Sequence, residues 1–347
     1  MRYLILSLDG GGARLLLQWT LLKRILGQYP DFLKEVTVFA GTSAGAILAS
    51  ALASGLENEA DEIITYENMR KVFERRATYK ISSLGGLVKS KYPNRNLRRL
   101  LETHLKDATL DQVPRALFIP AFAVNSNHLP PVHGAGKKES YPPGDAVSEE
   151  EKQESEQKKL AAQFEHIGAA GASASLQRRC ERWHPVFYHN LIDTDDRGVK
   201  VVEAVMKSTA APTYFPLDGN CVDGGVVHNN PSLAMLTHLL ALGAAPEEIY
   251  ILSLGTGEMP RELHVCDDAS LGLLKWVTCI LDMIMDGNQE AISQSVHQIL
   301  GNRFHRVEPL LSKDIALDDV SEHAEMMRVA NEYDLTETFE WIEWINQ

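Results

Sequence analysis

The chain has 347 residues, of which 44% are hydrophobic and 23% are charged, and its formal net charge at pH 7 is -13. This composition supplies enough apolar side chains for a large core, which excludes a chain that is disordered throughout. Because the chain is acidic overall, we expect no general affinity for nucleic acid or for anionic membranes.

The sequence contains no segment with the length of a membrane span or with the core of a signal peptide. The first apolar run ends at Asp9, and no apolar stretch reaches the roughly 18 to 20 residues of a membrane-spanning helix. The cysteines are far apart and form no CxxC pair, so neither a zinc site nor a disulfide framework is predicted. We therefore expect a cytoplasmic protein whose contact with membranes is at most peripheral.

Short apolar runs that end in glycines recur along the chain. Residues 3–8 lead into a glycine loop and then into apolar residues at helical spacing over 15–28. Residues 36–40 lead into a second glycine turn and a helix-prone segment, and residues 249–254 lead into a third. Strands that alternate with helices predict an α/β fold with a mostly parallel central sheet.

Three other segments do not fit this alternation of strands and helices. Basic residues gather between Arg70 and Arg99, which predicts either a cationic surface that orients the protein on anionic head groups or a solvated helical face. Residues 134–182 have few apolar anchors, so we expect an exposed insertion in a single domain spanning 1–347, with an active-site lid as the alternative. Residues 271–285 predict an amphipathic helix that either covers the sheet or docks on a membrane.

The second glycine turn fits the pattern G-x-S-x-G, with Gly41 and Gly45 on either side of Ser43. In such an elbow the serine lies on a sharp turn between a strand and a helix, and its hydroxyl projects at the carboxyl edge of the sheet. The amino terminus of the following helix favours negative charge on an attacked carbonyl. Ser43 is therefore the candidate nucleophile of an ester hydrolase.

The first glycine loop is a candidate anion site. The glycines Gly10, Gly11 and Gly12 leave backbone N–H groups free to converge on an anion, as a phosphate or as an oxyanion. A Walker loop would need Gly-Lys-Ser/Thr, and a Rossmann loop would need glycine where this chain has Leu15. An oxyanion hole is the other interpretation, because this loop and the elbow would end at one sheet edge. Arg14 would then brace the loop, hold an anionic group, or lie on a helix surface.

A serine nucleophile needs a base, and the sequence offers two candidates close together. Asp223 ends an apolar stretch and is followed by Gly224 and Gly225, which is also a common turn signal. Burial would raise the low pKa of an aspartate and make it a better proton acceptor. His228 is the rival, because histidine is the usual base of a catalytic serine. No motif for a metal site is present, so no metal or cofactor is predicted.

Several motifs occur together in one order. They are Asp9-Gly10-Gly11-Gly12-Ala13-Arg14, Gly41-Thr42-Ser43-Ala44-Gly45 and Asp223-Gly224-Gly225, joined by the segments 207–216, 229–231, 252–257 and 304–309. This combination resembles the patatin-like phospholipase family, which includes calcium-independent phospholipases A2. The resemblance covers about residues 1–133 and 183–332, and it departs from the family at Leu15, where glycine is usual.

The resemblance implies a three-layer α/β/α sandwich and a Ser43–Asp223 dyad that works without a histidine. It assigns the oxyanion hole to Gly10 through Gly12. The substrate class that it implies is a glycerophospholipid or a related acyl lipid, cleaved through an acyl-enzyme. Two alternatives stay open, namely a Ser-His-Asp esterase that uses His228 and a storage or ligand-sensing protein without enzymatic activity. Oligomeric state is not defined by these motifs.

Overall fold

The computed structural model describes residues 2–74, 90–124, 183–192, 195–260 and 273–347. The expected insertion at 134–182 lies outside these residues. Within them, apolar runs form the strands of one seven-stranded sheet with the order β4-β3-β2-β1-β6-β7, and β5 pairs with β3. The strands are β1 (Tyr3–Leu8), β2 (Val38–Gly41), β3 (Ala116–Ala123), β4 (His184–His189), β5 (Cys221–Asp223), β6 (Ile249–Leu254) and β7 (Phe304–Val307).

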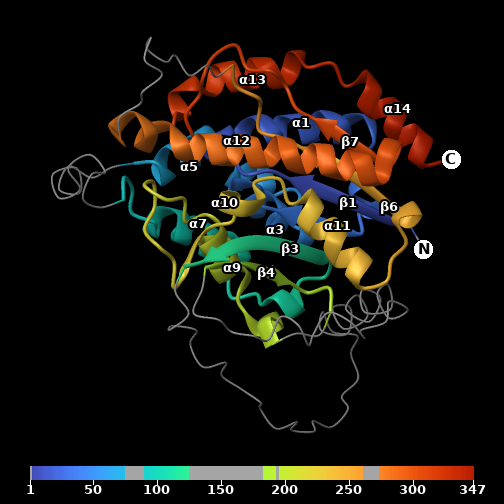
Figure 1. The fold of residues 1–347 in the computed structure, drawn as a ribbon, viewed down its shortest axis with the longest axis horizontal. Coiled ribbons are helices and arrows are strands. Elements are labelled where there is room, and N and C mark those ends of the chain that lie inside the picture. Colours follow the sequence, from blue (N-terminus) through green and yellow to red (C-terminus); the bar gives the residue numbers. More distant parts are fainter. Residues whose placement is uncertain (1, 75–89, 125–182, 193–194, 261–272) are drawn as a thin grey trace, which may run out of the picture.

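Helices cover both faces of this sheet (Figure 1). They are α1 (Leu15–Gln28), α2 (Phe32–Glu35), α3 (Ala44–Ala53), α4 (Ala60–Ile63), α5 (Tyr66–Val72), α7 (Arg95–Leu105), α9 (Val201–Ser208), α10 (Gly225–His228), α11 (Ser232–Ala241), α12 (Leu273–Leu300), α13 (His323–Glu332) and α14 (Thr336–Ile345). Short 3₁₀ turns link several of them.

Alternation along β1 divides the core into two apolar layers. Leu4, Leu6 and Leu8 join a cluster with α1, α3, α7, α9 and α13 on one face of the sheet. Tyr3 and Ile5 join a second cluster with α11 and α12 on the other face. Since successive side chains of a strand point to opposite faces, this division places the sheet between two helical layers. The predicted α/β sandwich with three layers is therefore confirmed.

The strand directions bring the loops of interest to one edge. β1 pairs in parallel with β2 and β6, and Leu8 lies opposite both Gly41 and Leu254. The carboxyl ends of these three strands therefore meet. β4 and β5 run antiparallel to β3, with Asp223 opposite Ala121. The sheet is thus mostly parallel but mixed, and the antiparallel members were not predicted.

The amphipathic helix predicted over 271–285 forms the first half of α12. Further along α12, the buried Ile292 and Val296 pack against the sheet. Ile280 and Ile284, by contrast, are 48% and 41% exposed. Among the described residues, no helix is both long enough and apolar enough to cross a membrane.

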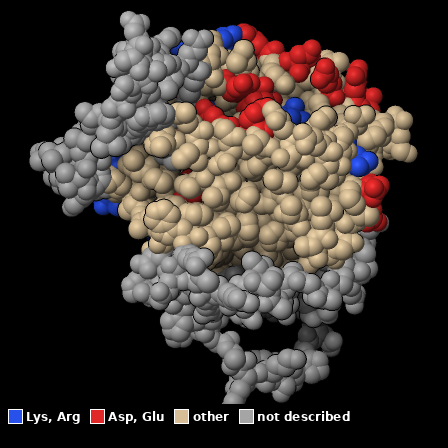
Figure 2. Space-filling model, viewed as in Figure 1, with Lys and Arg blue, Asp and Glu red and all other residues tan. Residues whose placement is uncertain are grey.

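Several side chains of the basic stretch are paired with carboxylates where the structure describes it. Arg70 pairs with Glu67 at 3.0 Å, and Arg98 reaches Asp218 at 2.8 Å. Residues 75–89, which hold several of the other basic side chains, lie outside the described chain. Figure 2 shows a face with few charged side chains, bordered by acidic residues along its upper rim.

Candidate active site

Ser43 lies on a strained turn between β2 and α3. Its backbone has φ 53° and ψ -121°, which a residue with a side chain rarely adopts. A Cβ on Gly45 would lie 2.2 Å from the carbonyl oxygen of Leu8, and one on Gly41 would lie 2.3 Å from the carbonyl oxygen of Gly45. Only glycines therefore let the turn pack this closely on β1. This is the geometry of a nucleophile elbow.

The structure brings Ser43 and Asp223 into direct contact. The Ser43 hydroxyl donates a hydrogen bond of 2.5 Å to Oδ2 of Asp223, and the N–H of Gly225 donates one of 2.7 Å to Oδ1. Asp223 is only 2% exposed. Burial raises the pKa of its carboxyl to about 7, although both hydrogen bonds act in the opposite direction. A carboxyl with this pKa is a competent proton acceptor near neutral pH.

Ser208, at the end of α9, connects the elbow to β3. The N–H of Ser43 donates to the Ser208 hydroxyl at 2.9 Å, and that hydroxyl donates to the carbonyl oxygen of Pro120 at 2.6 Å. The N–H of Gly224 donates to the Ser208 carbonyl at 3.3 Å, next to the aspartate. One residue thus fixes the backbones that carry both members of the dyad. The sequence analysis noted the segment 207–216 but gave Ser208 no role.

The glycine loop lies beside the elbow, but its donors differ from the expected set. The N–H of Gly10 already donates to the carbonyl oxygen of Asn229 at 3.1 Å, so Gly10 cannot serve as a free oxyanion donor. No described residue accepts a hydrogen bond from the N–H of Gly11 or Gly12, and both glycines line a pocket with Ser43. Ala44 also lines it, and its N–H begins α3 without an intrahelical acceptor. The candidate donors are therefore Gly11, Gly12 and Ala44, the last of which was missed.

Arg14 is buried beneath this loop, being only 5% exposed. Its guanidinium donates to the carbonyl oxygens of Gly11, at 3.4 Å, and Gly257, at 3.1 Å. The alternative of an arginine on a helix surface is therefore wrong. These contacts are those of a side chain that braces the loop.

His228 has a different environment from the dyad. Its ring centroid lies 5.5 Å from that of Phe187, and its Nδ1 is buried without a partner among the described residues. Burial lowers the pKa of this imidazole. Within the described chain, no histidine is hydrogen bonded to Ser43. In the same part of the protein no cluster of His, Cys, Asp and Glu could hold a metal ion.

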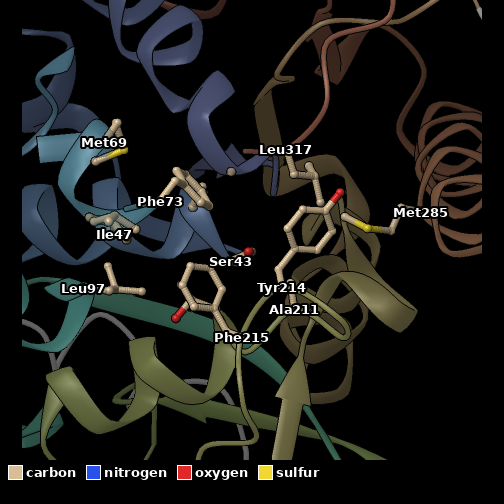
Figure 3. A pocket seen from close by; sticks show the side chains of 15 residues that line it. Ser43, Ile47, Met69, Phe73, Leu97, Ala211, Tyr214, Phe215, Met285 and Leu317 are labelled. Atoms are coloured by element: carbon tan, nitrogen blue, oxygen red, sulfur yellow. The ribbon is translucent and has the colours of Figure 1, made fainter. Parts of the chain in front are cut away.

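An apolar pocket of about 520 Å³, including its part open to solvent, extends from Ser43. Figure 3 shows Ile47, Met69 and Leu97 on one side of Ser43, and Tyr214, Met285 and Leu317 on the other. The full lining is Gly11, Gly12, Ser43, Ala44, Ile47, Met69, Val72, Phe73, Leu97, Thr209, Ala211, Tyr214, Phe215, Met285 and Leu317.

The family model described as patatin-like phospholipase matches residues 6–236, a range that contains the elbow, the glycine loop and Asp223. The chain belongs to the patatin-like phospholipase family. The resemblance noted from the sequence is thereby confirmed.

Two patatin-like relatives align along nearly the whole chain. Protein teg of Priestia megaterium and the putative sporulation hydrolase CotR of Bacillus subtilis are each 24% identical, over 99% of this chain and 98% of their own. The cGAMP-activated phospholipase of Pseudomonas aeruginosa is 25% identical over 92% of this chain and 83% of its own. These identities are low enough that substrate preference does not transfer with the family.

Proposed function

We propose that this chain is a lipid acyl hydrolase of the phospholipase A type, in which Ser43 is the nucleophile and Asp223 its base. The observation that carries the proposal is the 2.5 Å hydrogen bond from the Ser43 hydroxyl to the buried carboxyl of Asp223. Serine is a weak nucleophile until a neighbouring group accepts its proton. The pKa of about 7 suits Asp223 to that task.

The reaction proceeds through an acyl-enzyme. Asp223 accepts the Ser43 proton while the serine oxygen attacks the acyl carbonyl carbon, and the carbonyl oxygen becomes an oxyanion. The N–H groups of Gly11, Gly12 and Ala44 stabilise that charge. The protonated Asp223 then donates its proton to the departing alcohol oxygen, which leaves the acyl group on Ser43. Asp223 then deprotonates a water molecule, whose oxygen attacks the acyl-enzyme carbonyl. As the bond between Ser43 and the acyl group breaks, Asp223 returns the proton to the Ser43 oxygen, and the fatty acid leaves.

An acyl lipid is the proposed substrate because of the lining of the pocket. Its side chains are almost entirely apolar, with the exception of the hydroxyls of Ser43, Thr209 and Tyr214. A hydrocarbon chain gains about 0.8 kcal/mol for each methylene that it removes from water. A relative named a phospholipase supports a glycerophospholipid as the acyl donor. Access to such a substrate would require peripheral contact with a lipid surface.

Covalent labelling by a fluorophosphonate tests the nucleophile, because this probe phosphonylates an activated serine. We expect labelling of the wild type and none of Ser43→Ala. The same two proteins are then incubated with glycerophospholipid vesicles, and the released fatty acids are profiled. Labelling of the alanine variant would favour another nucleophile. A wild type that binds lipid without releasing fatty acid would favour a storage protein.

A further inference from the structure

Asn229 and Thr256 hold the oxyanion loop at Gly10. The N–H of Gly10 donates to the carbonyl oxygen of Asn229 at 3.1 Å. In return, Nδ2 of Asn229 donates to the carbonyl oxygen of Gly10 at 3.3 Å. The hydroxyl of Thr256 donates to the same carbonyl at 3.0 Å. Gly10 is therefore fixed through both of its backbone polar groups.

Fixing this carbonyl also determines where a proposed donor points. The carbonyl of Gly10 and the N–H of Gly11 belong to one planar trans peptide, so they point in opposite directions. When Asn229 and Thr256 hold the carbonyl, the Gly11 N–H is aimed toward the pocket that Gly11 lines. An oxyanion donor loses its effect when it is aimed away from the developing charge.

The orientation of the Asn229 amide depends on α12. Asn229 is 2% exposed, and its Oδ1 is buried with no partner among the described residues. Only the contacts of Nδ2 therefore fix the amide. Besides Gly10, Nδ2 donates to Oε1 of Gln289 at 2.9 Å. Gln289 lies one turn after Met285, which lines the pocket, so one helix contacts both the pocket and the loop support.

Gln289 is itself held by a partly buried charged group, the carboxylate of Glu308. Its Nε2 donates to Oε2 of Glu308 at 2.8 Å, and the N–H of Gly257 donates to Oε1 of Glu308 at 2.6 Å. Arg306 forms ion pairs with Glu308 and, at 2.6 Å, with Asp9 at the start of the glycine loop. Because Nε2 of Gln289 donates to the carboxylate of Glu308, the Oε1 atom of Gln289 faces Asn229.

We propose that Gln289 is a positioning residue that aims the Gly11 N–H at the oxyanion by orienting Asn229. The inference rests on the proposed function, because it assumes that the loop stabilises an oxyanion. Gln289 does not line the pocket. Its loss should therefore affect the transition state and leave the affinity for substrate nearly unchanged.

Gln289→Met tests this role, since methionine has a similar volume and no amide. Thr256 still donates to the carbonyl of Gly10 and Arg306 still pairs with Glu308, so the variant removes the support of the Asn229 amide without leaving either of these groups unpaired. With p-nitrophenyl octanoate we expect kcat to fall about tenfold, less than the loss of a whole donor, while KM changes by less than about twofold. A long-chain alkyl trifluoromethyl ketone forms an anionic adduct with serine. Its inhibition of the variant should weaken in parallel with kcat.

Gln294→Met is the matched control. Gln294 is an exposed residue of the same helix and bonds only to Glu290 among the described side chains. It should retain wild-type kinetics and inhibition. An unchanged kcat in Gln289→Met, or a change confined to KM, would overturn the positioning role. A wild type that cleaves no ester would overturn the proposed function as well, which separates the two failures.

An exchange of the pair keeps the proposal testable if Gln289→Met fails to fold. Gln289→Glu alone places two carboxylates side by side and should lower kcat near neutral pH. Adding Glu308→Gln restores a donor opposite residue 289, while its oxygen still accepts from Gly257. If kcat of the double variant is at least about threefold higher than that of Gln289→Glu, the result supports the positioning role of residue 289. Absence of any recovery in a double variant that folds contradicts it.

Discussion

The carboxyl of Asp223 combines a buried position with the contacts of a proton acceptor. A buried acid without a partner would stay protonated, and an exposed one would be too weak a base. Asp223 lies between these limits, because burial raises its pKa to about 7 while Ser43 and Gly225 donate hydrogen bonds to it. In the proposed mechanism, Asp223 therefore takes the role of base that a histidine has in a triad.

The dyad predicts opposite outcomes for two substitutions. Asp223→Asn keeps the size of the side chain and removes the base, so ester cleavage should fall by at least about a thousandfold. His228→Ala should retain activity within about threefold, because no hydrogen bond joins His228 to Ser43 in the described chain. Hydrolysis that survives in the asparagine variant and disappears in the alanine variant would instead favour the Ser-His-Asp esterase. Release of p-nitrophenol measures both.

Asp223 should also make the protein less stable as the pH rises. Its pKa is about 7 when folded and near 3.8 when unfolded. Between these values the folded state holds a proton that the unfolded state has lost, so the free energy of unfolding falls with increasing pH. Asp223→Asn removes this loss of unfolding free energy, because asparagine does not titrate. At about 1.36 kcal/mol for each unit of pKa difference, the variant should be more stable than the wild type at pH 8 by on the order of 2–4 kcal/mol.

Urea unfolding of wild type and Asp223→Asn at pH 5 and pH 8 measures this difference. The stabilisation should be smaller at pH 5, since the wild-type carboxyl is then largely protonated in the folded protein. Equal differences at the two pH values would mean that the carboxyl does not titrate in this range.

The proximity of Ser43 and Asp223 could be predicted from sequence because each residue carries a local signature. Ser43 is flanked by the glycines that its turn demands, and Asp223 ends an apolar run on a glycine turn. Ser208, Asn229 and Gln289 carry no such signature. Their roles depend on contacts between segments far apart in the chain, which periodicity and spacing do not encode.

At the scale of whole elements, the elbow is stabilised by α9 and β3 as well as by its own turn. The Ser208 hydroxyl accepts from the N–H of Ser43 and donates to Pro120, and both contacts are buried. Strain such as that of Ser43 persists only where neighbouring contacts hold it. The position of the nucleophile is therefore set by three elements together.

Ser208→Ala should weaken stability and catalysis together. It removes the hydroxyl that pairs with the N–H of Ser43 and with the carbonyl of Pro120, which should cost about 1–3 kcal/mol of unfolding free energy. Because the elbow loses its support, kcat should fall about tenfold or more. Thermal unfolding and ester kinetics measure the two effects.

Ser50→Ala provides the control for this substitution. Ser50 is a fully buried residue of α3, and its hydroxyl has no partner among the described residues. Its removal should be neutral or slightly stabilising. If Ser50→Ala and Ser208→Ala lower stability and kcat equally, Ser208 acts only through general packing.

Strands that are continuous apolar runs in the sequence were predicted, whereas strands that depend on hydrogen bonding to a neighbouring strand were not. The parallel strands β1, β2 and β6 are apolar runs that end in glycines, so their presence and their parallel direction could be predicted from sequence. β5 has only the residues Cys221–Asp223, and no strand was predicted over His184–His189. Both exist because the long β3 offers them hydrogen bonds, which is a tertiary effect.

At the scale of the whole molecule, the pocket is built from segments along most of the chain. α3, α5, α7 and α12 each contribute a lining side chain, and Leu317 contributes one from the segment before α13. The two sides seen around Ser43 (Figure 3) give room for an acyl chain on one side and for the rest of the substrate on the other. Selectivity for the acyl chain should therefore reside in side chains remote from the dyad in sequence.

Leu97→Phe tests which part of the pocket holds the acyl chain. Leu97 is 3% exposed and lies with Ile47 and Met69 on one side of Ser43. A larger side chain there should shorten the space, so kcat/KM for p-nitrophenyl palmitate should fall at least about tenfold more than for p-nitrophenyl butyrate. Leu101→Phe, one turn along α7 and outside the pocket lining, controls for overpacking of the core. If both variants lower the two esters equally, the acyl chain binds on the side of Tyr214 and Met285.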